Sequence, residues 1–250
     1  FDDEVISPGS IRHLYNMSKN GNGMSSQAVA EFLNDECINL DDLHMFERQT
    51  NTKNINVKFI GKCNSSTPFP DVEGSLDIQY QMGVNDHTNQ YYINMENWMY
   101  SFALELFKLK ATPHVISISW GWSEIDQCTG FNCTLNVDSV TYVKRTNVEF
   151  MKLALNGTTL VVSSGDAGSS GRVNEECMGD PYLNPVFPGG SPWIISVGGT
   201  VVTKPIVGAI NSPLCKNSPC IISGSEHNCI NDLVGWSSGA GFSNISSRQK

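Results

Sequence analysis

Residues 147–168, NVEFMKLALNGTTLVVSSGDAG, predict a helix, a strand and a turn in one short stretch. The apolar positions before Asn156 recur at helical spacing, and Asn156-Gly157 is typical of a helix end. The run TLVVSS is rich in β-branched residues and predicts a buried strand, after which SSGDAG predicts a Gly-rich turn. This order is typical of one helix–strand unit of an α/β fold.

Other segments repeat the same order along the chain. MENWMYSFALELFKL (95–109) predicts an amphipathic helix and ATPHVISISW (111–120) a buried strand, with Pro113 as the stop signal between them. FPGGSPWIISVGGTVV (187–202) predicts a further strand. Alternating helices and short apolar strands predict a parallel sheet, with functional groups at the carboxyl ends of its strands.

The amino-terminal region is less regular, and the region before the carboxyl end is expected to be loop. VEGSLDIQYQM (72–82) predicts a helix whose buried side includes Leu76, Ile78, Tyr80 and Met82. AVAEFL (28–33) fits a strand or a helix, and residues 205–232 are expected to be Cys-bearing loop.

Composition excludes several classes of protein. The chain has 250 residues, 40% of them hydrophobic, which is enough for one large folded domain or two small ones. The formal net charge of −9 has the wrong sign for a nucleic-acid-binding protein. No apolar run approaches the length of a membrane span. The start FDDEVISPG has neither a basic region nor an apolar one, so we expect that any signal peptide has been removed.

Cysteines and glycosylation motifs indicate the secretory route. Eight Cys accompany five Asn-x-Ser/Thr motifs, which predict glycosylation at Asn16, Asn64, Asn132, Asn156 and Asn244. We therefore expect a secreted or lysosomal protein. The expected disulfides are the short closures Cys128–Cys133 and Cys215–Cys220. No Cys or His spacing predicts a metal site.

Common catalytic motifs are absent or misplaced. The Gly-rich nucleotide loops and the HExxH motif do not occur. One G-x-S-x-G string is present at residues 235–239, but it leads into AGFSN, whereas a nucleophile elbow needs a strand before it and a helix after it. We interpret it as a loop.

Three acids are candidates for chemistry. Glu73 and Asp77 lie four positions apart, so a helix would present both on one face. They form either a solvated acidic face or a coupled pair in which one group is a general base. Asp166 follows the strand TLVVSS. It either caps that strand through an Asx turn or, when protonated, donates a hydrogen bond to a developing oxyanion.

Taken in order, these segments resemble the sedolisin family of serine-carboxyl peptidases. The resemblance rests on SPGSIRHLYNM, VEGSLDIQYQM, VISISWGWSE, NVEFMKLALNGTTLVVSSGDAG and FPGGSPWIISVGGT. It implies an α/β fold with a subtilisin-like parallel sheet and helices on both faces. It also implies acid-acting hydrolysis of peptides or proteins, with Glu73 as base, Asp77 as its orienting partner and Asp166 as the oxyanion acid. No His lies in a subtilase-like context, which disfavours an Asp-His-Ser site.

The resemblance also implies a substrate cleft. Its residues would be Ser119, Trp120 and Gly121 on one side, and Gly239 and Gly241 in a segment similar to the family's S-G-G-G-F-S.

The family's nucleophile motif, G-T-S-x-x-x-P, does not occur in the 250 residues, because Val201 follows Gly199-Thr200. Residues 1–250 then correspond to roughly the amino-terminal two-thirds of one catalytic domain, and the calcium loop of the family also lies beyond them. Either a smaller light chain supplies the serine and the calcium site, or the sequence is part of a longer domain. We expect the first, and expect these residues alone to be inactive.

Two other functions remain open at this point. One is a catalytically inactive sedolisin-like binding module or fragment. The other is a carbohydrate-binding or glycoside-hydrolysing domain that uses Glu73 and Asp166 as its two carboxyl groups.

Overall fold

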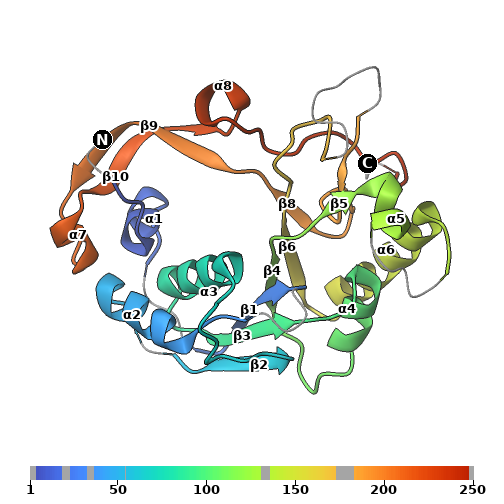
Figure 1. Cartoon of the computed structure of the whole chain (residues 1–250), viewed down its shortest axis with the longest axis horizontal. Coiled ribbons are helices and arrows are strands. Elements are labelled where there is room, and N and C mark those ends of the chain that lie inside the picture. Colours follow the sequence, from blue (N-terminus) through green and yellow to red (C-terminus); the bar gives the residue numbers. More distant parts are fainter. Residues whose placement is uncertain are drawn as a thin grey trace. The chain divides into compact units, whose positions relative to one another are not determined.

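The computed structural model describes residues 4–18, 23–32, 37–53, 55–130, 136–172 and 183–247. The chain divides into two compact units, each with its own parallel strands (Figure 1). The first unit comprises Phe1–Asn94 and Val202–His227, and the second comprises Met95–Val201 and Asn228–Lys250.

The first unit is built on three parallel strands in the order β2-β3-β1. Ser26 pairs with Asn89 and Glu31 with Asn94, so β1 and β3 run together over their whole lengths. The elements are strands β1 (Ser26–Glu31), β2 (Val57–Gly61) and β3 (Asn89–Asn94) and helices α1 (Pro8–Leu14), α2 (Leu40–Thr50), α3 (Val72–Val84) and α7 (Leu214–Asn217). The segment that fitted strand or helix is therefore a strand.

Helix α3 confirms the helix predicted at residues 72–82. Not every residue predicted for its buried side is buried. Ile78 and Met82 are fully buried, whereas Leu76 is 54% exposed. The buried row runs through Gly74, where a Cβ atom would lie 2.4 Å from the hydroxyl oxygen of Tyr92. Because this small residue allows β3 to approach the helix, the buried face is turned away from Leu76.

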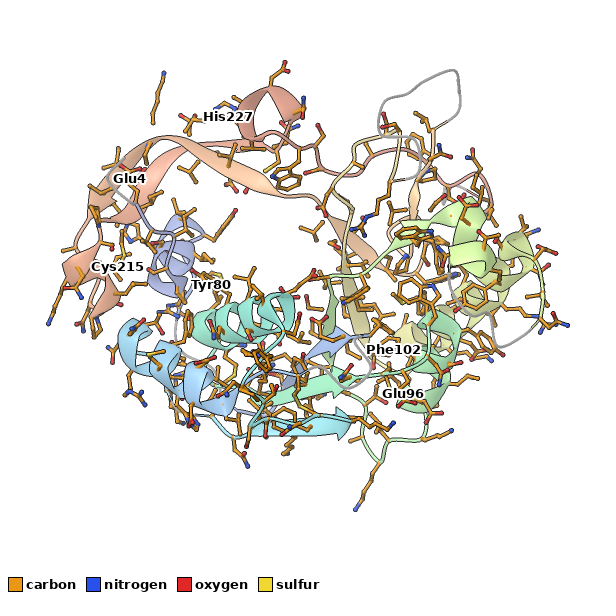
Figure 2. The ribbon with its side chains drawn as sticks, in the orientation of Figure 1. Glu4, Tyr80, Glu96, Phe102, Cys215 and His227 are labelled. Carbon is orange, nitrogen blue, oxygen red and sulfur yellow. A yellow bond between two sulfur atoms is a disulfide. The ribbon has the colours of Figure 1, made fainter. Side chains whose placement is uncertain are left out.

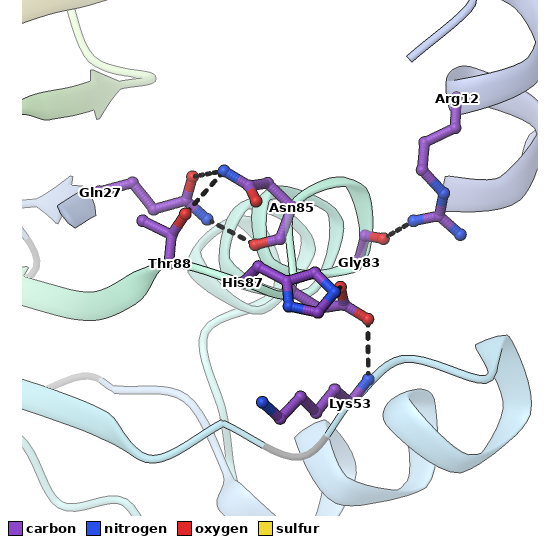
Figure 3. A network of polar contacts seen from close by, with 8 residues as sticks. Arg12, Gln27, Lys53, Gly83, Asn85, His87 and Thr88 are labelled. Carbon is purple, nitrogen blue, oxygen red and sulfur yellow. Dashed lines mark hydrogen bonds and ion pairs between the residues drawn. The ribbon is translucent and has the colours of Figure 1, made fainter. Parts of the chain in front are cut away.

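The carboxyl end of α3 is held by polar contacts (Figure 3). The side-chain amide of Gln27 donates to the carbonyl oxygen of Asn85 at 3.3 Å, and the amide of Asn85 donates to the hydroxyl of Thr88 at 2.8 Å. Arg12 of α1 donates to the carbonyl oxygen of Gly83. Nearer the middle of the helix, the hydroxyl of Tyr80 (Figure 2) donates to the carbonyl oxygen of Ile6 at 2.7 Å. These bonds fix the helix that carries two of the candidate acids.

The second unit has parallel strands in the order β4-β6-β8 and a short antiparallel pair, β5 with β7. The strands are β4 (Val115–Ile118), β5 (Trp122–Ser123), β6 (Thr159–Ser163), β7 (Val186–Phe187) and β8 (Ile195–Val197). The helices are α4 (Met99–Leu106), α5 (Gln127–Gly130), α6 (Ser139–Leu155) and α8 (Asn231–Val234), with one 3-10 turn, η1 (Glu124–Asp126).

The helix–strand unit predicted at residues 147–168 is confirmed. Helix α6 begins after Asp138, whose carboxylate accepts the backbone N–H of Thr141 at 2.8 Å. It ends at Leu155, with Asn156 as its C-cap, and the next residue, Gly157, has a φ of +88°. Its buried face includes Tyr142, Phe150 and Leu153. Helix α4 packs beside α6 and buries Phe102 completely (Figure 2).

The prediction of loop at residues 205–232 is wrong. Strands β9 (Thr200–Gly208) and β10 (Cys220–Asn228) pair in a two-stranded sheet. Most of their side chains are exposed or half-buried, so the apolar/polar alternation that marks a strand with one buried face is missing. Pro205 and Gly208, read from sequence as loop residues, lie within the strand.

Two disulfides lie in the first unit. Cys215–Cys220 was predicted and is confirmed, whereas Cys37–Cys63, which closes 26 positions, was not foreseen. Cys133, the expected partner of Cys128, lies outside the described residues. The α/β class is confirmed by the parallel strands and helices of both units. Within the ranges given above, no helix is long and apolar enough to cross a membrane.

Candidate active site

Asp166 lies directly beyond the carboxyl end of β6. The chain turns there because Gly165 and Gly168 take φ values of +105° and +60°, which side chains with a Cβ atom rarely adopt. Ala167 forms a short parallel bridge with Ser237. The carboxyl group of Asp166 is exposed. It therefore lies at the strand end where α/β proteins place their chemistry.

A cavity of about 970 Å³ surrounds this turn, entirely within the second unit. The lining residues include Asp166, Ser119, Gly121, Arg172, Trp236 and Gly239. Three of the predicted cleft residues therefore share one cavity with the predicted oxyanion acid. Trp120 and Gly241 are not among the lining residues.

Two glycines allow the walls of this cavity to pack closely. A Cβ atom at Gly121 would lie 2.4 Å from Cγ1 of Val186. At Gly239 it would lie 1.8 Å from the carbonyl oxygen of Ser164, and the backbone N–H of Gly239 donates to the carbonyl of Gly165 at 2.7 Å. Any larger residue at position 239 would push its segment away from the turn that carries Asp166.

Asp166 and Arg172 are the only charged residues among the described residues that line the cavity. The guanidinium carbon of Arg172 lies 5.4 Å from the ring centroid of Trp122, a cation–π arrangement. Sequence reasoning did not single out Arg172, because no spacing rule links it to Asp166.

Glu124 is not among the acids for which the sequence predicts a role. It follows β5, is 1% exposed, and accepts hydrogen bonds from the hydroxyl of Ser243 and, at 2.8 Å, from the backbone N–H of Asn244. Burial raises the pKa of Glu124 more than these bonds lower it. No local motif marks such a residue, because its partners lie more than a hundred positions away.

Glu73 and Asp77 belong to the first unit, one turn apart on α3. Glu73 is exposed in the first turn of the helix, and Asp77 is half-buried. Asp71 caps the helix by accepting the backbone N–H of Gly74. The helical spacing on which the prediction of a shared face depended is therefore present.

The surface near Glu73 is apolar. Phe69, Val72 and Leu76 are 84%, 82% and 54% exposed. Single exposed apolar side chains are common on protein surfaces. A further buried acid, Glu31, is fully buried at the carboxyl end of β1, opposite Asn94 in the register.

The predicted glycosylation positions and the G-x-S-x-G string lie outside the cavity site or outside the described residues. Asn156 follows the last residue of α6, Asn16 follows α1 and Asn64 lies in the loop before α3, and all three are exposed. Asn132 lies outside the described residues. Asn244 donates its side-chain amide to the carbonyl of Leu183 at 3.2 Å. The G-x-S-x-G string follows α8 and lacks a strand before it, as expected for a loop.

Comparisons with known proteins identify relatives. Physarolisin of Physarum polycephalum is 37% identical over an alignment of 228 positions, which covers 89% of this chain and 39% of that protein. Tripeptidyl-peptidase 1 of Homo sapiens is 27% identical over an alignment of 261 positions, which covers 96% of this chain and 38% of that protein. A solved Pseudomonas sedolisin (serine-carboxyl proteinase), complexed with two molecules of pseudo-iodotyrostatin, matches with a TM-score of 0.63 at 17% identity, covering 98% of this chain and 65% of that chain. The chain is similar in sequence to physarolisin and tripeptidyl-peptidase 1, and in fold to this sedolisin.

The predicted relation to sedolisins and the subtilisin-like α/β class are therefore confirmed. No family model matches the chain. The chain spans less than half the length of physarolisin and of human tripeptidyl-peptidase 1.

Proposed function

We propose that these residues form part of an acid-acting serine-carboxyl peptidase. Glu73 takes the proton of a serine hydroxyl that attacks the peptide carbonyl, and Asp77, one helical turn away, orients Glu73. Asp166 in its protonated form donates a hydrogen bond to the tetrahedral oxyanion. The serine belongs to polypeptide outside these 250 residues. Sequence relatives among the sedolisins support this assignment.

One observation carries the proposal most directly. Asp166 shares a cavity with Ser119, Gly121 and Gly239 at the carboxyl end of β6. An extended peptide bound in this cavity would be recognised through main-chain hydrogen bonds. Trp120 and Gly241 flank these cleft residues in sequence and complete the proposed substrate site.

The test is peptide hydrolysis by the protein expressed from its whole coding sequence. Glu73→Gln and Asp166→Asn should each lower kcat/KM by about 10²–10⁴-fold with little change in peptide binding. Asp41→Asn is the matched control for Glu73→Gln, because Asp41 is an exposed acid in the first turn of α2. Asp232→Asn, in the first turn of α8, is the control for Asp166→Asn. Near wild-type rates in either catalytic variant contradict the assignment.

The same assay separates the other candidate functions. A binding module would bind peptides but neither hydrolyse them nor form a covalent adduct with a peptide aldehyde, which requires a nucleophilic serine. A glycosidase would hydrolyse aryl glycosides instead of peptides.

The proposal extends to partners and location. A light chain that carries a G-T-S-x-x-x-P peptide would appear on mass spectrometry of the native protein under reducing, denaturing conditions. Among the described residues, no group of three or more His, Cys, Asp or Glu side chains could hold a metal ion. The calcium ion proposed for the complete enzyme would be held by the carboxyl-terminal part of the domain, beyond these 250 residues. The five glycosylation motifs and two disulfides support a secreted or lysosomal location.

A further inference from the structure

Glu124 joins two segments that are distant in the sequence. Its Oε2 atom accepts the hydroxyl hydrogen of Ser243, and its Oε1 atom accepts the backbone N–H of Asn244 at 2.8 Å. Both donors come from the same turn, which lies 119 and 120 positions further along the chain. At 1% exposure, this carboxyl group has little access to water in place of these partners.

The bonds around Ser243 define which way its proton points. A serine hydroxyl has one hydrogen to donate and two lone pairs that accept. The Ser243 oxygen accepts the backbone N–H groups of Ile245 at 3.1 Å and Ser246 at 2.7 Å. Its single hydrogen is therefore directed to Glu124. An amide in place of the carboxyl group would set an N–H donor against this O–H donor, or would leave the N–H of Asn244 without its acceptor.

Both joined segments contribute to the lining of the Asp166 cavity, together with residues between 163 and 172 and between 228 and 238. Ser119 and Gly121 line it shortly before Glu124, and Gly239 and Ala240 line it shortly before Ser243. We propose that Glu124 is a positioning residue for peptide binding, which holds the 239–246 segment against the 119–126 segment and so sets the width of the substrate cavity. This inference rests on the proposed peptidase function.

Other contacts keep the same segment folded when Glu124 is changed. The backbone N–H of Gly239 donates to the carbonyl of Gly165 at 2.7 Å, and the side chain of Asn147 on α6 donates to the hydroxyl of Ser246 at 2.9 Å. The segment therefore stays attached at both ends, and without Glu124 its middle keeps the bond from the side chain of Asn244 to the carbonyl of Leu183. We expect the fold of a Glu124→Gln variant to persist.

The experiment compares Glu124→Gln with Asp126→Asn in the protein expressed from its whole coding sequence. Asp126 is the other acid of η1, is half-buried, and accepts only the hydroxyl of Thr129 among the hydrogen bonds described, so this control makes the same charge change in the same turn. The first readout is hydrogen exchange, which does not depend on activity. Backbone amides of residues 244–246 should exchange about tenfold faster or more in Glu124→Gln, with α6 and β6 unchanged. Unchanged exchange at these amides would overturn the proposal.

The second readout is steady-state hydrolysis of a peptide. KM should rise about tenfold in Glu124→Gln while kcat changes less than about threefold, because the variant widens the cavity without touching the reacting atoms. A fall in kcat with KM unchanged, or equal effects of Asp126→Asn, would contradict a positioning role. Ser243→Ala removes the hydrogen bond from Ser243 to Glu124, which we call the Glu124 tie. The rise of KM in the double variant should therefore be no larger than the rise in the more affected single variant. Fully additive effects would count against the tie.

The two readouts keep this inference distinct from the proposed function. If the wild-type protein hydrolyses no peptide under any condition while residues 244–246 lose protection in Glu124→Gln, the peptidase function is wrong and the Glu124 tie stands as a structural one. If hydrolysis is normal and exchange is the same in both proteins, the peptidase function stands and the inference on Glu124 is wrong.

Discussion

The indole N–H of Trp98 donates to the side-chain oxygen of Gln127 at 2.8 Å, and both residues are buried. The amide group of Gln127 in turn donates to the carbonyl oxygens of Trp122 and Ser123 at 3.0 and 2.9 Å. One side chain therefore joins the start of α4 to β5, immediately beyond Gly121 of the cavity. Its three bonds fix the strand from which one cavity wall begins.

Replacing Gln127 by Leu keeps the volume of the side chain but removes all three bonds. The indole N–H of Trp98 and the two carbonyl oxygens lose a buried partner, and each such loss costs about 1–3 kcal/mol. We expect Gln127→Leu to lower the free energy of unfolding by roughly 3 kcal/mol or more in urea denaturation followed by tryptophan fluorescence. Thr129→Val, on the exposed side of the same helix, is the control. A Gln127→Leu protein as stable as the wild type would show that these bonds contribute nothing.

Local signals predicted the elements that position the site. Helix α6 and strand β6 were predicted because the Asn156-Gly157 end and the β-branched run both act within a few residues. Helix α3 was also predicted from local signals, and its helical geometry places Glu73 and Asp77 one turn apart.

Features that depend on distant partners were not predicted. The bonds of Glu124 come from residues 119 and 120 positions away, and Cys37 pairs with Cys63 across 26 positions. Strands β9 and β10 expose both faces and so lack a hydrophobic period. The burial of Ile78 in preference to Leu76 was missed because it depends on how closely Tyr92 of β3 approaches Gly74.

Glu47 on α2 predicts a dependence of stability on pH. It is 3% exposed, and burial raises its pKa above the ordinary 4.5, although the N–H of Ile55, His44 and Arg48 act in the opposite direction. Because the native state holds this proton more tightly than the unfolded state, the stabilisation is complete below pH 4.5 and is lost as the pH rises through the native pKa.

The variant Glu47→Gln stays neutral and keeps an oxygen that can accept from Ile55, so it should lose less stability than the wild type between acid and neutral pH. Urea denaturation at several pH values measures this difference. Asp41→Asn, at an exposed acid on the same helix, is the control. An identical slope in Glu47→Gln and wild type contradicts the prediction.

The cap of α3 links helix stability to the proposed chemistry. Asp71 accepts the N–H of Gly74, and Glu73 lies in the turn that this bond closes. Asp71→Ala should cost about 1 kcal/mol of stability, as loss of an N-cap generally does, and should also let the first turn fray. Fraying moves the carboxyl group of Glu73, so kcat for peptide hydrolysis should fall about tenfold while KM changes little.

Asp138→Ala is the matched control, because it removes the corresponding cap of α6, a helix that carries none of the proposed catalytic acids. It should reduce thermal stability and leave kcat near the wild-type value, whereas Asp71→Asn, which retains a capping oxygen, should restore most of the activity lost in Asp71→Ala. Equal falls of kcat in Asp71→Ala and Asp138→Ala would mean that activity follows global stability. Only a selective fall in Asp71→Ala, with recovery in Asp71→Asn, agrees with a catalytic Glu73 held in place by the first turn of α3.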